Sequence, residues 1–175
     1  MNETLTRALS GLVYIILLVG ATLFSPESFL VLFGSFLVIC TAEFCDLVNL
    51  KKTQPIVIAV IGFILFSYFN TFSKTNDYVL TAATLFISIR LIFFLFSDKR
   101  QHIDKQSKYV YLIGYIILPI IILTKIPYAG TTFKPEILIS IFIIIWTNDT
   151  FAYLVGKSIG KTKLYEKISP KKTLE

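Results

Sequence analysis

The stretch ILISIFIIIWTNDTFAYLVGKSIGK, residues 137–161, decides the fold. It begins with apolar side chains and is long enough to cross the hydrocarbon core of a bilayer, which takes about 20 residues of helix. The stretch then reaches Asn148 and Asp149 and passes without a break into glycines and lysines. Asp149 is therefore either the ordinary end of a membrane helix or part of a polar site.

The whole chain is apolar in composition. Of its 175 residues, 55% are hydrophobic and 16% are charged, and the mean hydropathy is +0.73. Soluble domains carry charge on about a quarter of their residues, so this composition predicts an integral membrane protein. The net charge of +6 comes from lysines that lie between apolar runs, which indicates membrane topology and contact with anionic lipids, not nucleic acid.

Six apolar stretches have, or nearly have, the length of a spanning helix. They predict an all-α, polytopic membrane protein whose residues 1–175 form a single transmembrane domain. A very short connection, Ser25 to Glu27, separates the first two stretches, which must therefore form a tight hairpin. Residues 157–175 follow the last span as a basic cytoplasmic segment. The predicted spans are 8–24, 28–46, 55–71, 77–97, 108–124 and 137–156.

Lysine and arginine are distributed unequally between the two sides of this arrangement. Thirteen of the 17 fall in the N-terminus, in the loops after the second and fourth spans, and in the tail. The opposite side carries only Lys74, Lys125 and Lys134, and Arg90 lies within the fourth span. Because short basic loops stay in the cytoplasm, both termini are predicted to be cytoplasmic, in a bacterial-type inner membrane.

Four ionisable residues lie inside predicted spans, each in the half nearer the cytoplasm: Glu43, Asp46, Arg90 and Asp149. A charge inside the membrane is costly, so each is a candidate functional residue, although long charged side chains near a helix end also reach the interface. Asp46 nearly leaves its span and is more simply a helix-end charge, whereas Glu43 and Arg90 fit either interpretation. The short side chain of Asp149 reaches the interface poorly, which favours a site there.

Helical spacing places Asp149 on one face with Tyr153, Gly156 and Gly160, at intervals of 4, 3 and 4 residues. One interpretation of the two glycines is a G-x-x-x-G face against which another helix packs. The other is that small residues let a large polar ligand approach the backbone beside Asp149. The two interpretations are compatible.

The segment ISPKKT, residues 168–173, resembles the start of a helix, with Ser169 as N-cap and Pro170 in the first turn. Lys171, Lys172 and Thr173 follow. Free backbone amides, the helix dipole and lysine charge together favour an anion, particularly phosphate. The alternative is an ordinary basic anchor at the membrane surface. A carboxylate beside such a phosphate site suits a divalent metal ion and a nucleoside triphosphate.

These motifs resemble the phosphatidate cytidylyltransferase family, also called CDP-diacylglycerol synthases. That family has the pattern D-[ST]-x-A-Y-x-x-G-x-x-x-G-K, followed by S-P-K-K-T-x-E. The opening TRALSGLVYI and the segment AEFCDL that ends the second span resemble the family more weakly. The residues that match the two patterns are Asp149, Ala152, Tyr153, Gly156, Gly160, Lys161, Ser169, Pro170, Lys171, Lys172, Thr173 and Glu175.

The resemblance implies an enzyme of phospholipid biosynthesis that joins CTP and phosphatidic acid into CDP-diacylglycerol, releases pyrophosphate and uses Mg²⁺. It implies catalytic roles for Asp149, Lys171 and Lys172, with Asp149 also a candidate metal ligand. Membrane lipids are expected partners, and a homodimer is left open. The implied substrate-binding residues are Tyr153, Gly156, Gly160, Lys161, Ser169 and Thr173.

One departure from the family bears on activity. The family continues beyond S-P-K-K-T-x-E into further spans and a signature with paired aspartates, which would supply the main metal ligands, and this sequence contains no such signature. The chain is therefore expected to be an N-terminal part that is inactive alone. The alternatives are a CTP-dependent polyprenol or phytol kinase-like enzyme, a non-catalytic membrane fragment, and a transporter. A transporter would gather polar residues at the bilayer midplane, not on one side.

Overall fold

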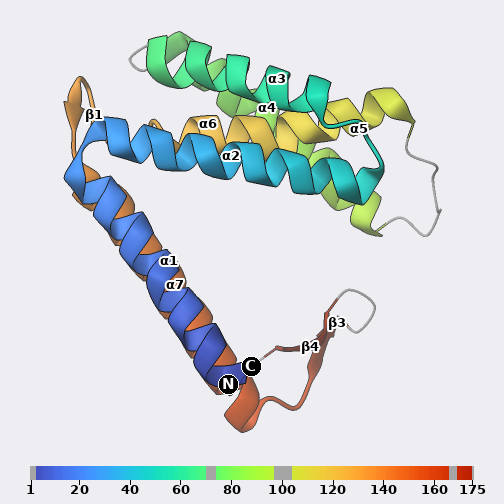
Figure 1. Ribbon diagram of the computed structural model, residues 1–175. Helices are drawn as coiled ribbons and strands as arrows, with labels where there is room; N and C mark the ends of the chain where they lie inside the picture. The colour runs from blue at the N-terminus through green and yellow to red at the C-terminus, as the bar shows by residue number, and fades with distance from the viewer. Residues whose placement is uncertain (1–2, 70–73, 97–103, 166–168, 175) are drawn as a thin grey trace. The chain divides into compact units, whose positions relative to one another are not determined.

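The computed structural model describes residues 3–69, 74–96, 104–165 and 169–174, and these are mostly helical (Figure 1). Each predicted span coincides with a helical segment, so the prediction of an all-α polytopic protein is confirmed. Residues 70–71 and 97, at the ends of two predicted spans, lie outside the described residues. The segments are α1 (Glu3–Phe24), α2 (Pro26–Val48), α3 (Thr53–Phe63) with the π-helix η1 (Ile64–Phe69), α4 (Lys74–Phe96), α5 (Lys105–Tyr111) with the π-helix η2 (Leu112–Ile117) and α6 (Leu118–Leu123), and α7 (Pro135–Ile159).

Within the described residues, four helical segments are long and apolar enough to cross a membrane. They are α2, α4, the continuous segment Lys105–Leu123, and α7. Leu9–Phe24 and Thr53–Phe69 form shorter apolar helices. The chain is thus a membrane protein with several spanning helices, whereas the number of six spans and the cytoplasmic termini stay predictions.

The chain divides into two compact units, Met1–Pro135 and Glu136–Glu175, and each is described here by itself. The single transmembrane domain expected from the sequence stays a prediction.

The connection between α1 and α2 in the first unit is built by two serines. Ser25 has extended backbone, and its hydroxyl oxygen accepts a hydrogen bond from the Ser28 N–H at 3.1 Å, while the Ser28 hydroxyl oxygen accepts from the Ser25 N–H at 3.0 Å. This reciprocal pair is a capping box, and Pro26 supplies the fixed φ suited to a first helical turn. Since Ser25 alone separates the two helices, the predicted tight hairpin is confirmed.

The core of the first unit lies among α2, α3, α4, η2 and α6, where Leu37, Ala59, Leu80, Leu112 and Ile121 are all buried. These helices lie side by side in Figure 1. Their other faces carry exposed apolar side chains, as a lipid-facing bundle requires. A small β-ribbon, β1 (Tyr128–Ala129) with β2 (Thr132–Phe133), follows α6.

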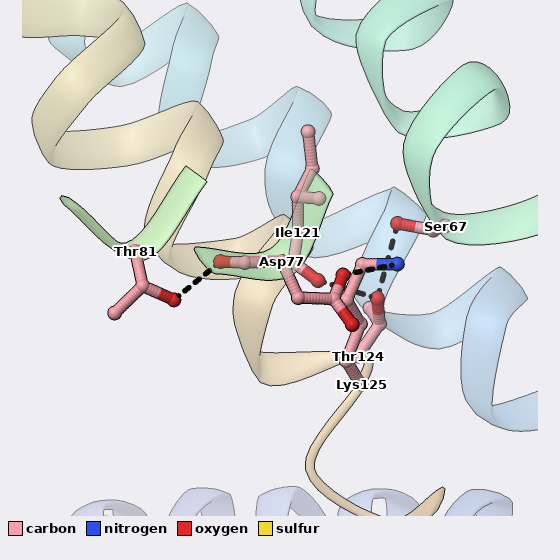
Figure 2. Close-up of polar contacts among 6 residues, drawn as sticks. All are labelled: Ser67, Asp77, Thr81, Ile121, Thr124 and Lys125. Carbon is pink, nitrogen blue, oxygen red and sulfur yellow. Dashed lines mark hydrogen bonds and ion pairs between the residues drawn. The ribbon is translucent and has the colours of Figure 1, made fainter. Parts of the chain in front are cut away.

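A polar cluster joins η1, α4 and the end of α6 (Figure 2). The Lys125 ammonium lies 3.0 Å from the Asp77 carboxylate, and only 9% of the Lys125 side chain and 32% of the Asp77 side chain are exposed. Beside them the Thr124 hydroxyl lies within hydrogen-bond distance of both the Ser67 hydroxyl, at 3.0 Å, and the Ile121 carbonyl, at 2.6 Å. This partly buried ion pair joins the start of α4 to the residues that follow α6.

The second unit is α7 followed by an antiparallel ribbon of β3 (Lys163–Tyr165) and β4 (Ser169–Thr173). Lys163 lies opposite Thr173, and Tyr165 lies opposite Ser169. The predicted helix start at Ser169 and Pro170 is therefore wrong. The backbone of this segment bonds across to residues 163–165, so it does not present the free amides of a helix N-terminus.

Candidate functional site

A hollow of about 400 Å³ lies between α7 and β4 in the second unit. Its lining from α7 shows three members of the predicted helical face, because α7 continues unbroken through Ile159 and so brings Asp149, Tyr153 and Gly156 to one side. Gly160, the fourth predicted member, lies beyond the end of the helix. Ala152, which matches the family pattern but was not among the predicted site residues, also lines it. The spacing of three residues from Asp149 could have identified it. Among the described residues, the lining is Asp149, Ala152, Tyr153, Gly156, Lys172 and Thr173.

The two glycines allow β4 to come close to α7. A Cβ atom on Gly156 would lie 3.4 Å from the Thr173 hydroxyl oxygen, and one on Gly160 would lie 2.6 Å from that oxygen and would also overlap the Gly156 carbonyl. Any side chain at Gly160 would therefore clash with the backbone of α7 and displace the Thr173 side chain. Within this unit the glycines pack against a strand, not against another helix as one sequence interpretation expected.

The Thr173 hydroxyl is a buried polar group at this site. Its oxygen is buried and, within the residues that the structure describes, has no hydrogen-bond partner. Leaving such a group unsatisfied costs roughly 1–3 kcal/mol. An oxygen of a bound ligand in the hollow would remove that cost.

Charges of both signs face the hollow. Asp149 contributes a carboxylate and Lys172 an ammonium, and both side chains are exposed. The Lys157 ammonium lies 5.8 Å from the centre of the Tyr153 ring, a cation–π contact that adds positive charge to the same helix face. Lys163 donates to the Pro170 carbonyl at 2.6 Å and so steadies the ribbon that carries Lys172. The hollow thus combines a group that attracts phosphate with one that attracts a cation.

Two of the other predicted site residues, Lys161 and Ser169, are not among the described residues that line this hollow. Lys161 follows Gly160 just after the end of α7 and is exposed, and Ser169 is held in the ribbon opposite Tyr165. Lys171 lies in β4 between Pro170 and Lys172. Their proposed roles stay predictions.

The other three ionisable residues inside predicted spans belong to the first unit. Asp46, in the last turn of α2, forms an ion pair at 2.7 Å with Lys52, which lies beyond the end of that helix. This contact suits a helix-end charge. Glu43 and Arg90 are exposed on α2 and α4. The fourth candidate, Asp149, lines the polar hollow beside β4.

The donor set bears on whether Mg²⁺ suits this hollow. Among the described residues, no group of three or more His, Cys, Asp or Glu side chains is placed to hold a metal ion. Mg²⁺, however, keeps several waters and commonly binds through one or two carboxylates together with substrate phosphates. Asp149 fits a Mg²⁺ ion that arrives with a phosphate ligand, and does not by itself form a preformed metal cage. The Thr173 hydroxyl lies farther along the helix, beside Gly156 and Gly160, and is not placed to bind the same ion.

Several proteins with sequences similar to this chain share one name, phosphatidate cytidylyltransferase. The chain is 43% identical over 91 residues to the phosphatidate cytidylyltransferase of Aquifex aeolicus. The aligned region covers 52% of this chain and 34% of that protein. It is 42% identical over 72 residues to that of Rickettsia typhi, covering 41% of this chain and 32% of that protein. With that of Bacillus subtilis the identity is 58% over 33 residues, or 19% of this chain and 12% of that protein.

The chain thus matches about a third or less of the length of these relatives. No solved structure matches it. The model of the cytidylyltransferase family matches residues 5–175, which includes both α7 and the β3–β4 ribbon. Because that match covers nearly the whole chain, the protein belongs to the cytidylyltransferase family.

Proposed function

We propose that the chain serves the reaction for which its relatives are named, the transfer of a cytidylyl group from CTP to phosphatidic acid. A phosphate oxygen of phosphatidic acid attacks the α-phosphorus of CTP, the bond from that phosphorus to the β-phosphate oxygen breaks, and pyrophosphate leaves with the electron pair. The products are CDP-diacylglycerol and pyrophosphate. The observation that carries the proposal is the hollow lined by Asp149, Lys172 and Thr173, residues that match the family pattern. Among the described residues, the buried Thr173 hydroxyl has no hydrogen-bond partner.

Different residues of the hollow are proposed to bind and to position the substrates. Lys172 attracts the phosphates, and the Thr173 hydroxyl donates a hydrogen bond to a phosphate oxygen. Gly156 and Gly160 keep the strand close enough for that hydroxyl to reach the hollow. Because no covalent intermediate is required, holding the two reactants in line and neutralising charge supplies the catalysis. Lys171, Lys161 and Ser169 are proposed as further contacts around the same phosphates.

Asp149 is proposed to hold a cation against the phosphates. Mg²⁺ bound in this way would neutralise negative charge on the reacting phosphates.

Replacing Lys172 with Gln is expected to weaken CTP binding by about tenfold, or about 1.4 kcal/mol, because a charge-assisted hydrogen bond to phosphate is lost. The measurement is equilibrium binding of radiolabelled CTP to the purified chain. Lys134→Gln is the matched control, since this exposed lysine precedes α7 and does not line the hollow. Equal binding by the wild type and Lys172→Gln, or an equal loss in the control, would contradict a phosphate contact at Lys172.

We further propose that the site faces the cytoplasm, as the distribution of Lys and Arg indicates. In a chain whose Cys40 and Cys45 are replaced by Ala, Lys105→Cys is expected to react with a membrane-impermeant maleimide from the cytoplasmic side, and Thr131→Cys from the other. Both positions are exposed. Asp104 is left intact because it caps α5, and a hydrogen bond from the Ser107 side chain lowers its pKa. The reverse labelling pattern would place the site outside, where CTP is absent.

A further inference from the structure

The first unit contains an apolar groove of about 550 Å³, separate from the hollow beside Asp149. Side chains of α2, α4 and the α5–η2 segment line it, including Phe44, Leu91, Leu95 and Tyr115. Among the described residues, its lining is almost entirely apolar, and Lys108 is the one charged residue in that lining. A groove of this kind, between helices of a membrane protein, suits a hydrocarbon chain.

A second hollow, of about 610 Å³, lies between the α2–α3 connection and the start of α5. Three lysines, Lys51, Lys105 and Lys108, line it, and no carboxylate does so among the described residues. Nearby Lys52 is already paired with Asp46. The hollow therefore concentrates positive charge, which suits an anion such as phosphate.

Lys108 joins the two hollows because it lines both. Its ammonium donates to the carbonyl of Val48, the last residue of α2, at 2.6 Å, which fixes the side chain at the junction. An ammonium has three N–H donors, and this bond uses one of them. Tyr109, held by a 3.0 Å hydrogen bond to Gln54, lines the basic hollow, and Tyr111 lines the groove. Tyrosines are enriched where membrane meets water, which is the level of a lipid headgroup.

We propose that the two hollows form one binding site for an anionic glycerophospholipid. An acyl chain lies in the groove, and the phosphate lies among the three lysines. The apolar lining and the adjacent positive charge are together complementary to such a lipid. A soluble anion would leave the apolar groove empty. A zwitterionic lipid would place its own positive charge near the lysines. The site lies within residues 1–135 and does not depend on the proposed transfer reaction.

The test uses phosphatidylglycerol, whose phosphate is already a diester and so cannot receive a cytidylyl group. Spin-labelled phosphatidylglycerol and phosphatidylcholine are compared for binding to the purified chain in phosphatidylcholine vesicles. The wild type is expected to prefer phosphatidylglycerol. Lys51→Gln with Lys105→Gln should lower that preference by roughly 25-fold, since a lysine near an anionic lipid contributes about a fivefold gain in affinity.

The matched control is Lys74→Gln with Lys134→Gln, which removes two exposed lysines that line neither hollow. It should retain the preference within about twofold. An equal loss in this control would mean general attraction between the protein surface and anionic lipid, and would overturn the proposal. An unchanged preference in Lys51→Gln with Lys105→Gln would overturn it as well.

The groove is tested by Ser88→Phe, which fills it, against Ala83→Phe, an exposed position on the same helix that does not line it. Ser88→Phe should abolish the preference for phosphatidylglycerol, and Ala83→Phe should keep it. Retained preference in a folded Ser88→Phe variant, or displacement of the lipid by millimolar inorganic phosphate, would mean that the groove holds no acyl chain. If circular dichroism shows Ser88→Phe to be misfolded, the lysine variants and phosphate competition decide the question.

Discussion

Asp149→Asn is expected to lower CTP-dependent formation of CDP-diacylglycerol by the native gene product at least about 10²-fold. That loss corresponds to roughly 2.7 kcal/mol or more, at 1.36 kcal/mol per tenfold. The substitution keeps the shape of the side chain and removes its charge. Asp149 contributes the carboxylate of the hollow that also holds Lys172 and Thr173. If that carboxylate positions a cation against charge that develops during transfer, its loss should lower kcat and kcat/KM together.

Glu136→Gln is the matched control, since it removes an exposed carboxylate from the first turn of the same helix. Turnover by this variant should stay within a few-fold of the wild type. A similarly small effect of Asp149→Asn, at normal protein levels, would show that Asp149 only ends the span. The phosphate contacts of β4 would then be the remaining part of the proposed site.

The second large effect is expected at the ion pair of Asp77 and Lys125. Asp77→Asn should lower the free energy of unfolding by about 2–4 kcal/mol, because it leaves an ammonium that is largely shielded from solvent without its carboxylate. This expected loss of stability is somewhat smaller than the loss for a fully buried ion pair, because 32% of the Asp77 side chain is exposed. The measurement is a denaturant titration of the detergent-solubilised protein, in which loss of helical content reports unfolding.

A double variant separates the pair from its surroundings. Asp77→Asn with Lys125→Gln should cost less than the sum of the two single variants, because neither charge is then left alone. Lys52→Gln, which breaks the exposed pair with Asp46, should cost no more than about 1 kcal/mol. Costs that add fully in the double variant, or an Asp77→Asn effect as small as that of Lys52→Gln, would show that the pair contributes little.

The helices and the face that carries Asp149 could be predicted because both follow from local rules. Inside a bilayer the backbone must satisfy its own hydrogen bonds, so long apolar runs become helices whatever their detailed sequence. The unbroken helical spacing from Asp149 to Gly156 then fixes which side chains share a face. Ala152 could have been added to the site by the same rule.

The β3–β4 ribbon could not be predicted because Ser169 and Pro170 give the same local signal before a helix and within a ribbon. Pairing with residues 163–165 decides between the two, and no helical or alternating pattern marks those residues. The Asp77–Lys125 pair was missed for a related reason. Its members are far apart in the sequence and lie at helix ends, where charges are ordinary, so only the packing of α4 against α6 brings them together.

The central claim is that the protein transfers the cytidylyl group of CTP to a lipid. Membranes that contain the native gene product are incubated with phosphatidic acid and CTP labelled at either the α- or the γ-phosphate. Cytidylyl transfer predicts that the α-label enters the lipid fraction as CDP-diacylglycerol, while the γ-label is released into water as pyrophosphate. Appearance of the γ-label in lipid would instead show a CTP-dependent lipid kinase, and α-label absent from lipid would contradict the proposed reaction.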